Sequence, residues 1–246
     1  MLHILILAGG KATRMGGDHP KALADINGKP ILGHLFERIE SACPRPTVVV
    51  GAHNGNEIID RMGDRFDYVF QDEQLGTAHA VLCAKEILTQ MKNITSLLVL
   101  YGDHPLVTAG TAKKLEELRE KQNAAVAMAT VQVPNFDADF VLFRNWGRVV
   151  RASDDTVLKV VEVKDATSDE KKITEVSPSF LCFEPAWPWS NLHLVKNDNA
   201  KKEYYLTDMV NIAIAQNKKI VTMPVPPVEA MGANTPQEIA IVSKYL

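Results

Sequence analysis

The sequence predicts an α/β protein with a Rossmann-like, mixed and mostly parallel sheet, helices on both faces and an antiparallel-rich lobe. Three observations predict this fold. In the first half of the chain, short apolar runs alternate with segments of helical periodicity. The first run, Leu2–Leu7, ends in Ala8-Gly9-Gly10, as a buried strand that enters a loop does. After residue 124, strand-like segments follow one another with little helix between them.

The first half of the chain is expected to form parallel strands joined by helices. The strands are expected at Leu2–Leu7, Thr47–Val50, Asp67–Phe70 and Leu97–Tyr101. The helices are expected at Ile31–Ser41, Glu57–Met62, Thr77–Met91 and Thr111–Lys121. Because crossovers between parallel strands are right-handed, the carboxyl ends of these strands should meet at one edge of the sheet, where ligands bind.

The second half is expected to form the lobe and then to return to the sheet. Strands of the lobe are expected at Ala124–Val133, Phe140–Arg144, Arg148–Arg151, Val157–Val163 and Val176–Phe183. A helix at Tyr205–Asn217, a strand at Lys219–Val225 and a helix that starts at Thr235-Pro236 should complete the chain.

Composition and charge exclude several classes of protein. The 246 residues include 27 lysines and arginines against 30 aspartates and glutamates, a net charge of -3, with no basic run. We therefore expect no nucleic-acid partner and no membrane partner. The 3 cysteines lack C-x-x-C spacing, which argues against zinc and a disulfide framework. Without a secretory signal or an apolar stretch of ~20 residues, a cytoplasmic protein is expected, and its oligomeric state is left open.

The segment Leu7–Lys21 has the features of a phosphate-binding loop. Glycines after a strand let backbone N–H groups approach phosphate oxygens, and Arg14 and Lys21 can supply positive charge. A glycine-rich turn with surface cations is the alternative, and the loop alone does not separate the two. The glycine spacing excludes a Walker A loop, and Ala12, two residues after Gly10, excludes a dinucleotide fingerprint.

Two further segments follow expected strands at the same edge. In Gln71–Ala80, glutamine side chains could read a base edge, although a helix cap is the plainer interpretation of Thr77. In Tyr101–Leu106, Asp103 stands at a strand's end, where a Mg²⁺ ligand is expected, and a turn-forming aspartate is the alternative. Each of the three segments is weak evidence for a ligand site by itself. Because all three are expected at the same edge of the sheet, together they indicate one site.

Taken together, these segments and later ones resemble the sugar-nucleotide pyrophosphorylase family. Within that family the chain is similar to the N-acetylglucosamine-1-phosphate uridyltransferase domain of the bacterial bifunctional enzyme of UDP-N-acetylglucosamine synthesis. The family's L-A-(A/G)-G-x-G-T-R-M…P-K loop, its Q-x-x-Q-L-G-T-x-H-A segment and its Y-G-D-x-P-L segment correspond to residues 7–21, 71–80 and 101–106. The motifs G-R-I-V-R, V-E-x-K-D-A-T, N-x-N-A-Q-G-E-Y-Y-x-T-D and G-(V/I)-N correspond to residues 147–151, 161–167, 197–208 and 232–234.

The resemblance implies a role for each matching residue. Those that would bind the nucleotide are Leu7, Ala8, Gly9, Gly10, Gln71, Gln74, Gly76 and Thr77. The catalytic cations facing the triphosphate would be Arg14 and Lys21. The sugar phosphate would contact Tyr101, Gly147, Glu162 and Ser177, and an exposed glutamate at a strand's end is the plain alternative for Glu162. Mg²⁺ would be held by Asp103 and Asn234.

The implied reaction is Mg²⁺-dependent nucleotidyl transfer. UTP and N-acetylglucosamine 1-phosphate, or a related sugar 1-phosphate, would give an NDP-sugar and pyrophosphate. No covalent protein nucleophile is needed, so catalysis would consist of positioning and charge stabilisation. The resemblance implies a single nucleotidyltransferase domain over 1–246, with a nucleotide-binding half at 1–123 and a sugar-binding lobe at 124–184; residues 185–246 would complete the sheet and the metal site.

The chain departs from the family mainly on the sugar side. The family's E-(I/V)-N-T-G is Glu175-Val176-Ser177-Pro178-Ser179 here, so a serine replaces an asparagine and a proline removes a backbone donor. Ala12 also replaces a loop glycine. A non-hexose phosphate acceptor and a catalytically silent nucleotide-binding regulator therefore stay open as alternatives. The sequence ends at Leu246 without the family's hexapeptide repeats, so no acetyltransferase activity is expected.

Overall fold

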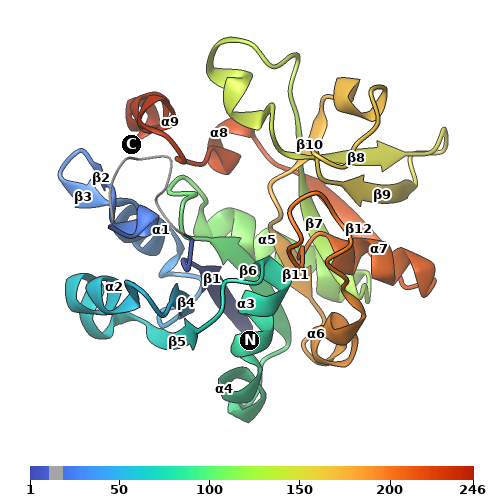
Figure 1. Cartoon of the computed structure of the whole chain (residues 1–246). Helices are drawn as coiled ribbons and strands as arrows, with labels where there is room; N and C mark the ends of the chain where they lie inside the picture. Colours follow the sequence, from blue (N-terminus) through green and yellow to red (C-terminus); the bar gives the residue numbers. More distant parts are fainter. Residues whose placement is uncertain (11–18) are drawn as a thin grey trace.

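The computed structural model describes residues 1–10 and 19–246, and its main element is one large mixed sheet (Figure 1). The parallel part runs in the order β5 (Asp67–Gln71), β4 (Thr47–Gly51), β1 (Leu2–Leu7) and β6 (Ser96–Tyr101). It continues through antiparallel pairs as β11 (Leu181–Phe183), β7 (Val126–Gln132), β10 (Glu175–Ser177), β8 (Gly147–Arg151) and β9 (Val157–Val161). β12 (Ile220–Pro224) pairs parallel with β7. The mixed α/β sheet predicted from the sequence is confirmed.

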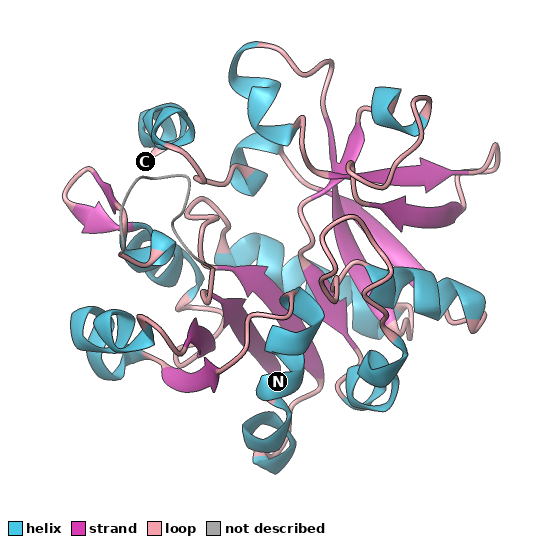
Figure 2. Ribbon diagram, viewed as in Figure 1, coloured by secondary structure: helices cyan, strands magenta, loops and turns pink. Residues whose placement is uncertain are grey.

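Helices cover both faces of the parallel part (Figure 2). One apolar cluster packs the sheet against α1 (Ile31–Ile39), α2 (Gly55–Met62) and α5 (Ala109–Lys121). The other packs it against α3 (Thr77–Cys83), α4 (Lys85–Gln90), α6 (Ala186–Asn191) and α7 (Asp208–Ala215). In β1, Ile4 and Ile6 belong to the first cluster, whereas Leu5 and Leu7 belong to the second. Because both sides of this strand are buried, its sequence is a continuous apolar run.

The remaining elements are short. The last two helices are α8 (Pro227–Ala230) and α9 (Pro236–Val242), and a small hairpin consists of β2 (Asp25–Ile26) and β3 (Lys29–Pro30). The 3₁₀ helices are η1 (Lys21–Leu23), η2 (Gly63–Arg65), η3 (Ala138–Phe143), η4 (Glu170–Lys172), η5 (Leu192–Leu194) and η6 (Ser243–Tyr245). Within the described ranges, no helix is long and apolar enough to cross a membrane.

Two strands predicted for the lobe are wrong. The segment predicted as a strand at Phe140–Arg144 lies mostly in η3, where Leu142 and Phe143 are buried as direct neighbours. The backbone bonds are those of a 3₁₀ helix, since Phe140 N donates to Asp137 O at 2.9 Å and Arg144 N donates to Val141 O at 3.1 Å. The strand predicted at Val176–Phe183 is two strands, β10 and β11. Pro178 has no N–H for a ladder, and Ser179 has a φ of 58°, so the chain turns between them.

Two predicted helices have different limits. The helix predicted at Thr77–Met91 is divided at Ala84, where the Ala84 N–H donates to Val81 O at 3.1 Å as in a 3₁₀ turn. The helix predicted to begin at Tyr205 begins at Asp208. The backbone just before it bonds elsewhere, since Tyr204 N donates to Leu75 O at 2.8 Å.

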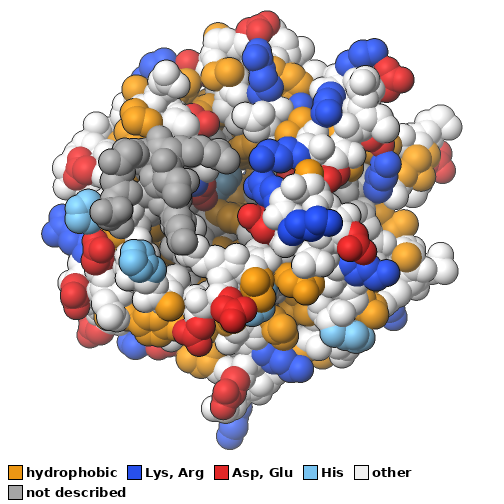
Figure 3. Space-filling model, in the orientation of Figure 1, with side chains coloured by type: hydrophobic (Ala, Val, Ile, Leu, Met, Phe, Trp, Pro, Cys, Tyr) orange, Lys and Arg blue, Asp and Glu red, His pale blue; other side chains and the backbone are white. Residues whose placement is uncertain are grey.

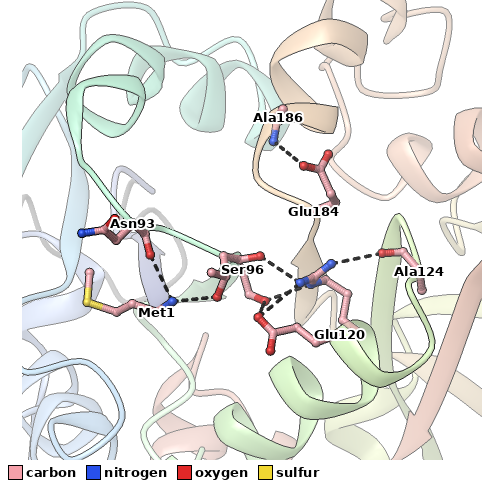
Figure 4. Close-up of polar contacts among 9 residues, drawn as sticks. Met1, Asn93, Ser96, Glu120, Ala124, Glu184 and Ala186 are labelled. Atoms are coloured by element: carbon pink, nitrogen blue, oxygen red, sulfur yellow. Dashed lines mark hydrogen bonds and ion pairs between the residues drawn. The ribbon is translucent and has the colours of Figure 1, made fainter.

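The amino end of β6, opposite the ligand edge, is occupied by a network of polar groups (Figure 4). The Arg119 guanidinium, 6% exposed, donates to Ser96 Oγ at 2.9 Å and to Thr95 O at 2.8 Å. The ammonium of Met1 donates to Asn93 O at 3.1 Å. The contacts of Arg119 satisfy its guanidinium, as a buried polar group requires, whereas Met1 is exposed.

Candidate active site

Two adjoining cavities lie where the carboxyl ends of β1, β5 and β6 meet the lobe, and Figure 3 shows the hollow in this face. The first cavity measures about 450 Å³ and lies over the parallel strands. The second measures about 240 Å³ and extends towards β8 and β10. The side chains that line both are Thr77, Tyr101, Asp103, Lys201 and Glu203. The two cavities therefore form one continuous site with a shared wall.

The predicted site residues are brought together at these cavities. The first cavity is lined by all residues predicted to bind nucleotide, namely Leu7, Ala8, Gly9, Gly10, Gln71, Gln74, Gly76 and Thr77, and also by Lys21. The second is lined by the residues predicted to contact the sugar phosphate, Tyr101, Gly147, Glu162 and Ser177, together with Asp103 and Asn234. Arg14 and Ala12 lie outside the described residues. The roles of all these residues stay predictions.

The walls of the first cavity are fixed by hydrogen bonds between its segments. The Gln71 amide donates to Gly76 O at 3.1 Å and lies 3.0 Å from Nδ1 of His79. The Gln74 amide donates to Gly9 O, which closes the loop after β1 against the segment after β5. The amides most able to read a base edge are thus held at the cavity wall.

Thr77 does not cap its helix, so the plainer interpretation of this residue is wrong. No side-chain hydrogen bond caps α3, and the Thr77 hydroxyl instead accepts from Leu206 N at 2.8 Å. The backbones also pair beside this contact, because Tyr204 N donates to Leu75 O at 2.8 Å and Ala78 N donates to Tyr204 O at 2.9 Å. The segment 204–206 is therefore docked onto the start of α3 and forms part of the cavity wall.

Lys21, Asp103 and Asn234 meet at the centre of the site. The Lys21 ammonium, on η1, donates to Oδ2 of Asp103 and to Oδ1 of Asn234. Burial acts to raise the pKa of the Asp103 carboxyl, but the charge and hydrogen bond of Lys21 outweigh it, and the pKa lies below its usual value. Asp103 is therefore an anion at neutral pH and is paired with the Lys21 ammonium.

The Asp103–Asn234 pair fits a divalent cation. A carboxylate oxygen and an amide oxygen converge on one positive charge, at present the Lys21 ammonium. Both are hard ligands of the type that Mg²⁺ prefers, and Mg²⁺ in phosphate sites takes only one or two protein oxygens. Across residues 1–10 and 19–246, no three His, Cys, Asp or Glu side chains gather into a metal site. A metal here would depend on this pair and on substrate oxygens.

His104 holds the Asn234 segment in place. Its Nδ1, 2.8 Å from Ala230 O, must carry the proton of this hydrogen bond because a carbonyl only accepts. Burial lowers the pKa of His104, so the ring is neutral at pH 7. Ala233 N also donates to Asp103 O at 2.9 Å. These two bonds bring the Asn234 side chain to Asp103 from a distant part of the chain.

Glu162, just beyond the end of β9, lines the second cavity. Its Oε1 accepts from Thr207 Oγ1 at 3.0 Å and faces Gly147. Burial raises the pKa of the Glu162 carboxyl. The exposed-glutamate alternative is thus wrong. Burial also raises the pKa of Tyr101.

The Ser177-Pro178-Ser179 turn lines the second cavity, and Ser177 stands at the position where the family has an asparagine. Ser177 is 4% exposed, and its Oγ accepts from Ser179 N at 3.1 Å. Its oxygen therefore takes part in the local turn, and its O–H can still donate to a ligand. This wall offers the acceptor a hydroxyl and no amide.

Several residues of the site have no role predicted from the sequence. They are His104, Lys201, Glu203 and Thr207. The sequence does contain a signal for Lys201, Glu203 and Thr207, because they belong to the motif matched at residues 197–208. Nothing in that motif indicates which of its side chains face the cavity.

Known proteins are similar to this chain over most of its length. Residues 4–156 match the family of the MobA-like NTP transferase domain. The chain is 35% identical to the bifunctional protein GlmU of Brevibacillus brevis over 246 residues, 100% of this chain and 51% of that protein. It is 34% identical to the GlmU of Latilactobacillus sakei, with 98% of this chain and 51% of that protein covered. The chain thus spans about half the length of these relatives.

A solved structure has the same fold. A protein assigned as a glucose-1-phosphate thymidylyltransferase from Bacillus anthracis superposes with a TM-score of 0.78, covering 100% of this chain and 95% of that chain. The identity is 14%, so this likeness concerns the fold alone.

Proposed function

The chain belongs to the MobA-like NTP transferase domain family, and we propose that it transfers a nucleotidyl group from UTP to a sugar 1-phosphate. The products are a UDP-sugar and pyrophosphate, and N-acetylglucosamine 1-phosphate or a related sugar 1-phosphate is the acceptor. One observation carries this proposal. Lys21, Asp103 and Asn234 converge at the place where a cavity large enough for a nucleotide adjoins a smaller one.

The arrangement supports an in-line displacement without a covalent intermediate. A phosphate oxygen of the acceptor forms a bond to the α-phosphorus of UTP, and the bond from that phosphorus to the bridging oxygen of pyrophosphate breaks. Charge grows on the transferring phosphate and on the leaving group. Lys21, and Arg14 as predicted from the sequence, would stabilise that charge. When bound by Asp103 and Asn234, Mg²⁺ would neutralise phosphate charge further.

The remaining residues would orient the two substrates. Gln71 and Gln74 would hold the base in the first cavity, with the backbone of Gly9 and Gly10 near the phosphates. Glu162 would accept a hydrogen bond from a sugar hydroxyl in the second cavity. Such positioning converts a bimolecular encounter into a reaction between fixed groups, which lowers the barrier by several kcal/mol.

A screen of donors against acceptors tests the proposal. The purified protein is incubated with Mg²⁺, each of the four common nucleoside triphosphates and a panel of sugar 1-phosphates, and released pyrophosphate is measured. UTP with a hexose 1-phosphate should give the highest rate. The Asp103→Ala variant should lose roughly 10²–10³-fold in kcat. Absence of pyrophosphate with every pair would refute the enzyme proposal, and UTP binding without turnover would favour the nucleotide-binding regulator.

A second candidate keeps the nucleotide half and changes the acceptor. The Ser177-Pro178-Ser179 turn removes the amide that the family uses on the sugar side, which favours a smaller or differently shaped phosphate. Polyol phosphates and phosphocholine are added to the same panel, with products identified by mass spectrometry. Clear preference for a hexose 1-phosphate would eliminate this candidate.

A further inference from the structure

We infer that Lys201 binds the phosphate of the acceptor, as the second cation of the site beside Lys21. The inference rests on the proposed function and deepens it, because it assigns a ligand contact to a residue outside the predicted site. Lys201 lines both cavities, whereas Lys21 lines only the first of the two. The acceptor phosphate must lie at the shared wall, since it reacts with a phosphate held in the first cavity.

The charges of the second cavity require such a cation. Its wall includes the carboxylates of Asp103, Glu162 and Glu203. A sugar 1-phosphate brings roughly one to two further negative charges at neutral pH. Among the described residues that line this cavity, Lys201 is the one lysine or arginine. Without it, the described lysines and arginines that line this cavity would offer the acceptor phosphate no counter-charge, and Lys21 is already paired with Asp103.

The ammonium of Lys201 is available for a ligand. Its Nζ lies 3.9 Å from Oε2 of Glu203 and 6.0 Å from the centre of the Tyr205 ring. A hydrogen bond to a charged group requires a shorter distance, near ~2.8 Å. The lysine is therefore held near the cavity by loose contacts that a phosphate can replace.

The backbone that carries Lys201 is fixed. Asn199 Oδ1 accepts from the backbone N–H groups of Lys201 and of Glu203, both at 3.2 Å. Ala200 N donates to Oδ1 of Asp165 at 2.9 Å, and the Asn199 amide donates to Glu203 O at 2.6 Å. A loop held in this way fixes the position from which the Lys201 side chain extends, as a binding residue needs.

The neighbouring Lys202 provides a matched control. It follows Lys201 on the same loop and carries the same charge, but it does not line either cavity. The motif that this loop matches has Gln-Gly at these two positions. Lys201→Gln therefore tests the inferred contact by a substitution that the loop is expected to accept, and Lys202→Gln removes an equal charge outside the cavities.

The experiment measures the kinetic constants of both substrates and the binding of the acceptor. Lys201→Gln should raise KM for N-acetylglucosamine 1-phosphate, or for the best acceptor of the screen, roughly 10- to 100-fold. It should leave KM for UTP within about twofold. Lys201→Arg should keep most of the acceptor affinity, and Lys202→Gln should behave as the wild type. Equal acceptor KM values for the wild type and Lys201→Gln would overturn the inference while the proposed function stands.

A binding measurement separates the inference from turnover. N-acetylglucosamine 1-phosphate is titrated calorimetrically into the wild type and Lys201→Gln, with Mg²⁺ and a non-hydrolysable UTP analogue present. Weaker binding by Lys201→Gln alone supports the inference even if no pyrophosphate is released, in which case the proposed function fails separately. Equal binding, or none by the wild type, overturns the inference.

Discussion

Gly76 lies directly against the backbone of Tyr204. A Cβ added to Gly76 would lie 2.5 Å from Tyr204 O and 2.6 Å from Tyr204 N, and the φ of Gly76 is 124°. Both the close approach and this φ require glycine. The contact joins the start of α3 to the segment that also carries Lys201. The nucleotide side of the site and the loop inferred to bind the acceptor phosphate are therefore one packed unit.

Replacing Gly76 should disrupt this unit. Gly76→Ala should lower the free energy of unfolding by about 1–3 kcal/mol and weaken UTP binding, because the residue must leave its φ or displace Tyr204. Urea unfolding and UTP titration measure the two effects. Gly110→Ala is the control, since a Cβ there meets Thr108 Oγ1 at 3.6 Å, an ordinary contact, within helix α5. It should be neutral or stabilising by up to about 1 kcal/mol. Equal stabilities of the two variants would contradict the role of Gly76.

Lys21 should compete with a metal for Asp103 and Asn234. Lys21→Met removes the ammonium between the two oxygens, so Mn²⁺ should bind several-fold more tightly to the nucleotide-free protein, as measured by electron paramagnetic resonance. Turnover should fall roughly 10²–10³-fold, because a charge that stabilises the transition state is lost. Lys29→Met removes a lysine paired with Glu37 at 2.6 Å outside the two cavities and should change neither quantity. Weaker Mn²⁺ binding by Lys21→Met would refute the competition.

Glu162 should lower stability at neutral pH. Its pKa is raised in the folded protein, so the native state binds more protons than the unfolded state above the unfolded pKa of about 4.3. Stability therefore falls as pH rises through this window. Glu162→Gln, which can still accept from Thr207, should be more stable than the wild type near pH ~7.5, with a gain that shrinks towards pH ~4.5. Urea unfolding at both pH values measures this gain.

Glu170 should raise stability at neutral pH, in contrast to Glu162. Hydrogen bonds from Lys159 and from the backbone and side chain of Thr167 lower its pKa to about 2. Its contribution to stability is present above about pH 4.3 and is lost as pH falls towards 2. Glu170→Gln should therefore be less stable than the wild type near pH ~7.5, with a difference that decreases on acidification. A gain in both glutamine variants at neutral pH would contradict the assigned signs.

His104 should act on the metal requirement through Asn234. His104→Phe keeps a ring against Trp146 and Phe180 but loses the donor to Ala230 O. It should raise the Mg²⁺ concentration needed for half-maximal rate while KM for UTP changes little. His104→Asn, which retains an N–H donor, should recover part of the loss. His53→Asn, at an exposed histidine outside the two cavities, is the control. Identical Mg²⁺ titrations of His104→Phe and the wild type would refute this positioning role.

The sequence determined the order of the strands along the chain and the strand ends at which the site lies. The apolar run of β1 predicted a strand buried on both faces, and the polar residues that follow β5 and β6 predicted the strand ends that carry the site. Both predictions were possible because apolar runs and polar strand ends are local properties of the sequence. Residues that follow successive parallel strands are brought to one edge by chain topology alone. Lys21, Gln71 and Asp103 could thus be placed together without knowledge of any contact.

Tertiary structure decided the features that depend on distant contacts. Phe140–Arg144 has the composition of a strand, yet it lies mostly in η3, where Leu142 and Phe143 pack into the first apolar cluster. The hydroxyl of Thr77 bonds to Leu206 N, 129 residues away, and so does not cap a helix. Lys201 and Lys202 are alike in sequence, and only the fold of the 197–208 loop brings one of them to the cavities. Periodicity reports which side chains are apolar, whereas side-chain partners depend on packing between segments that the local pattern does not encode.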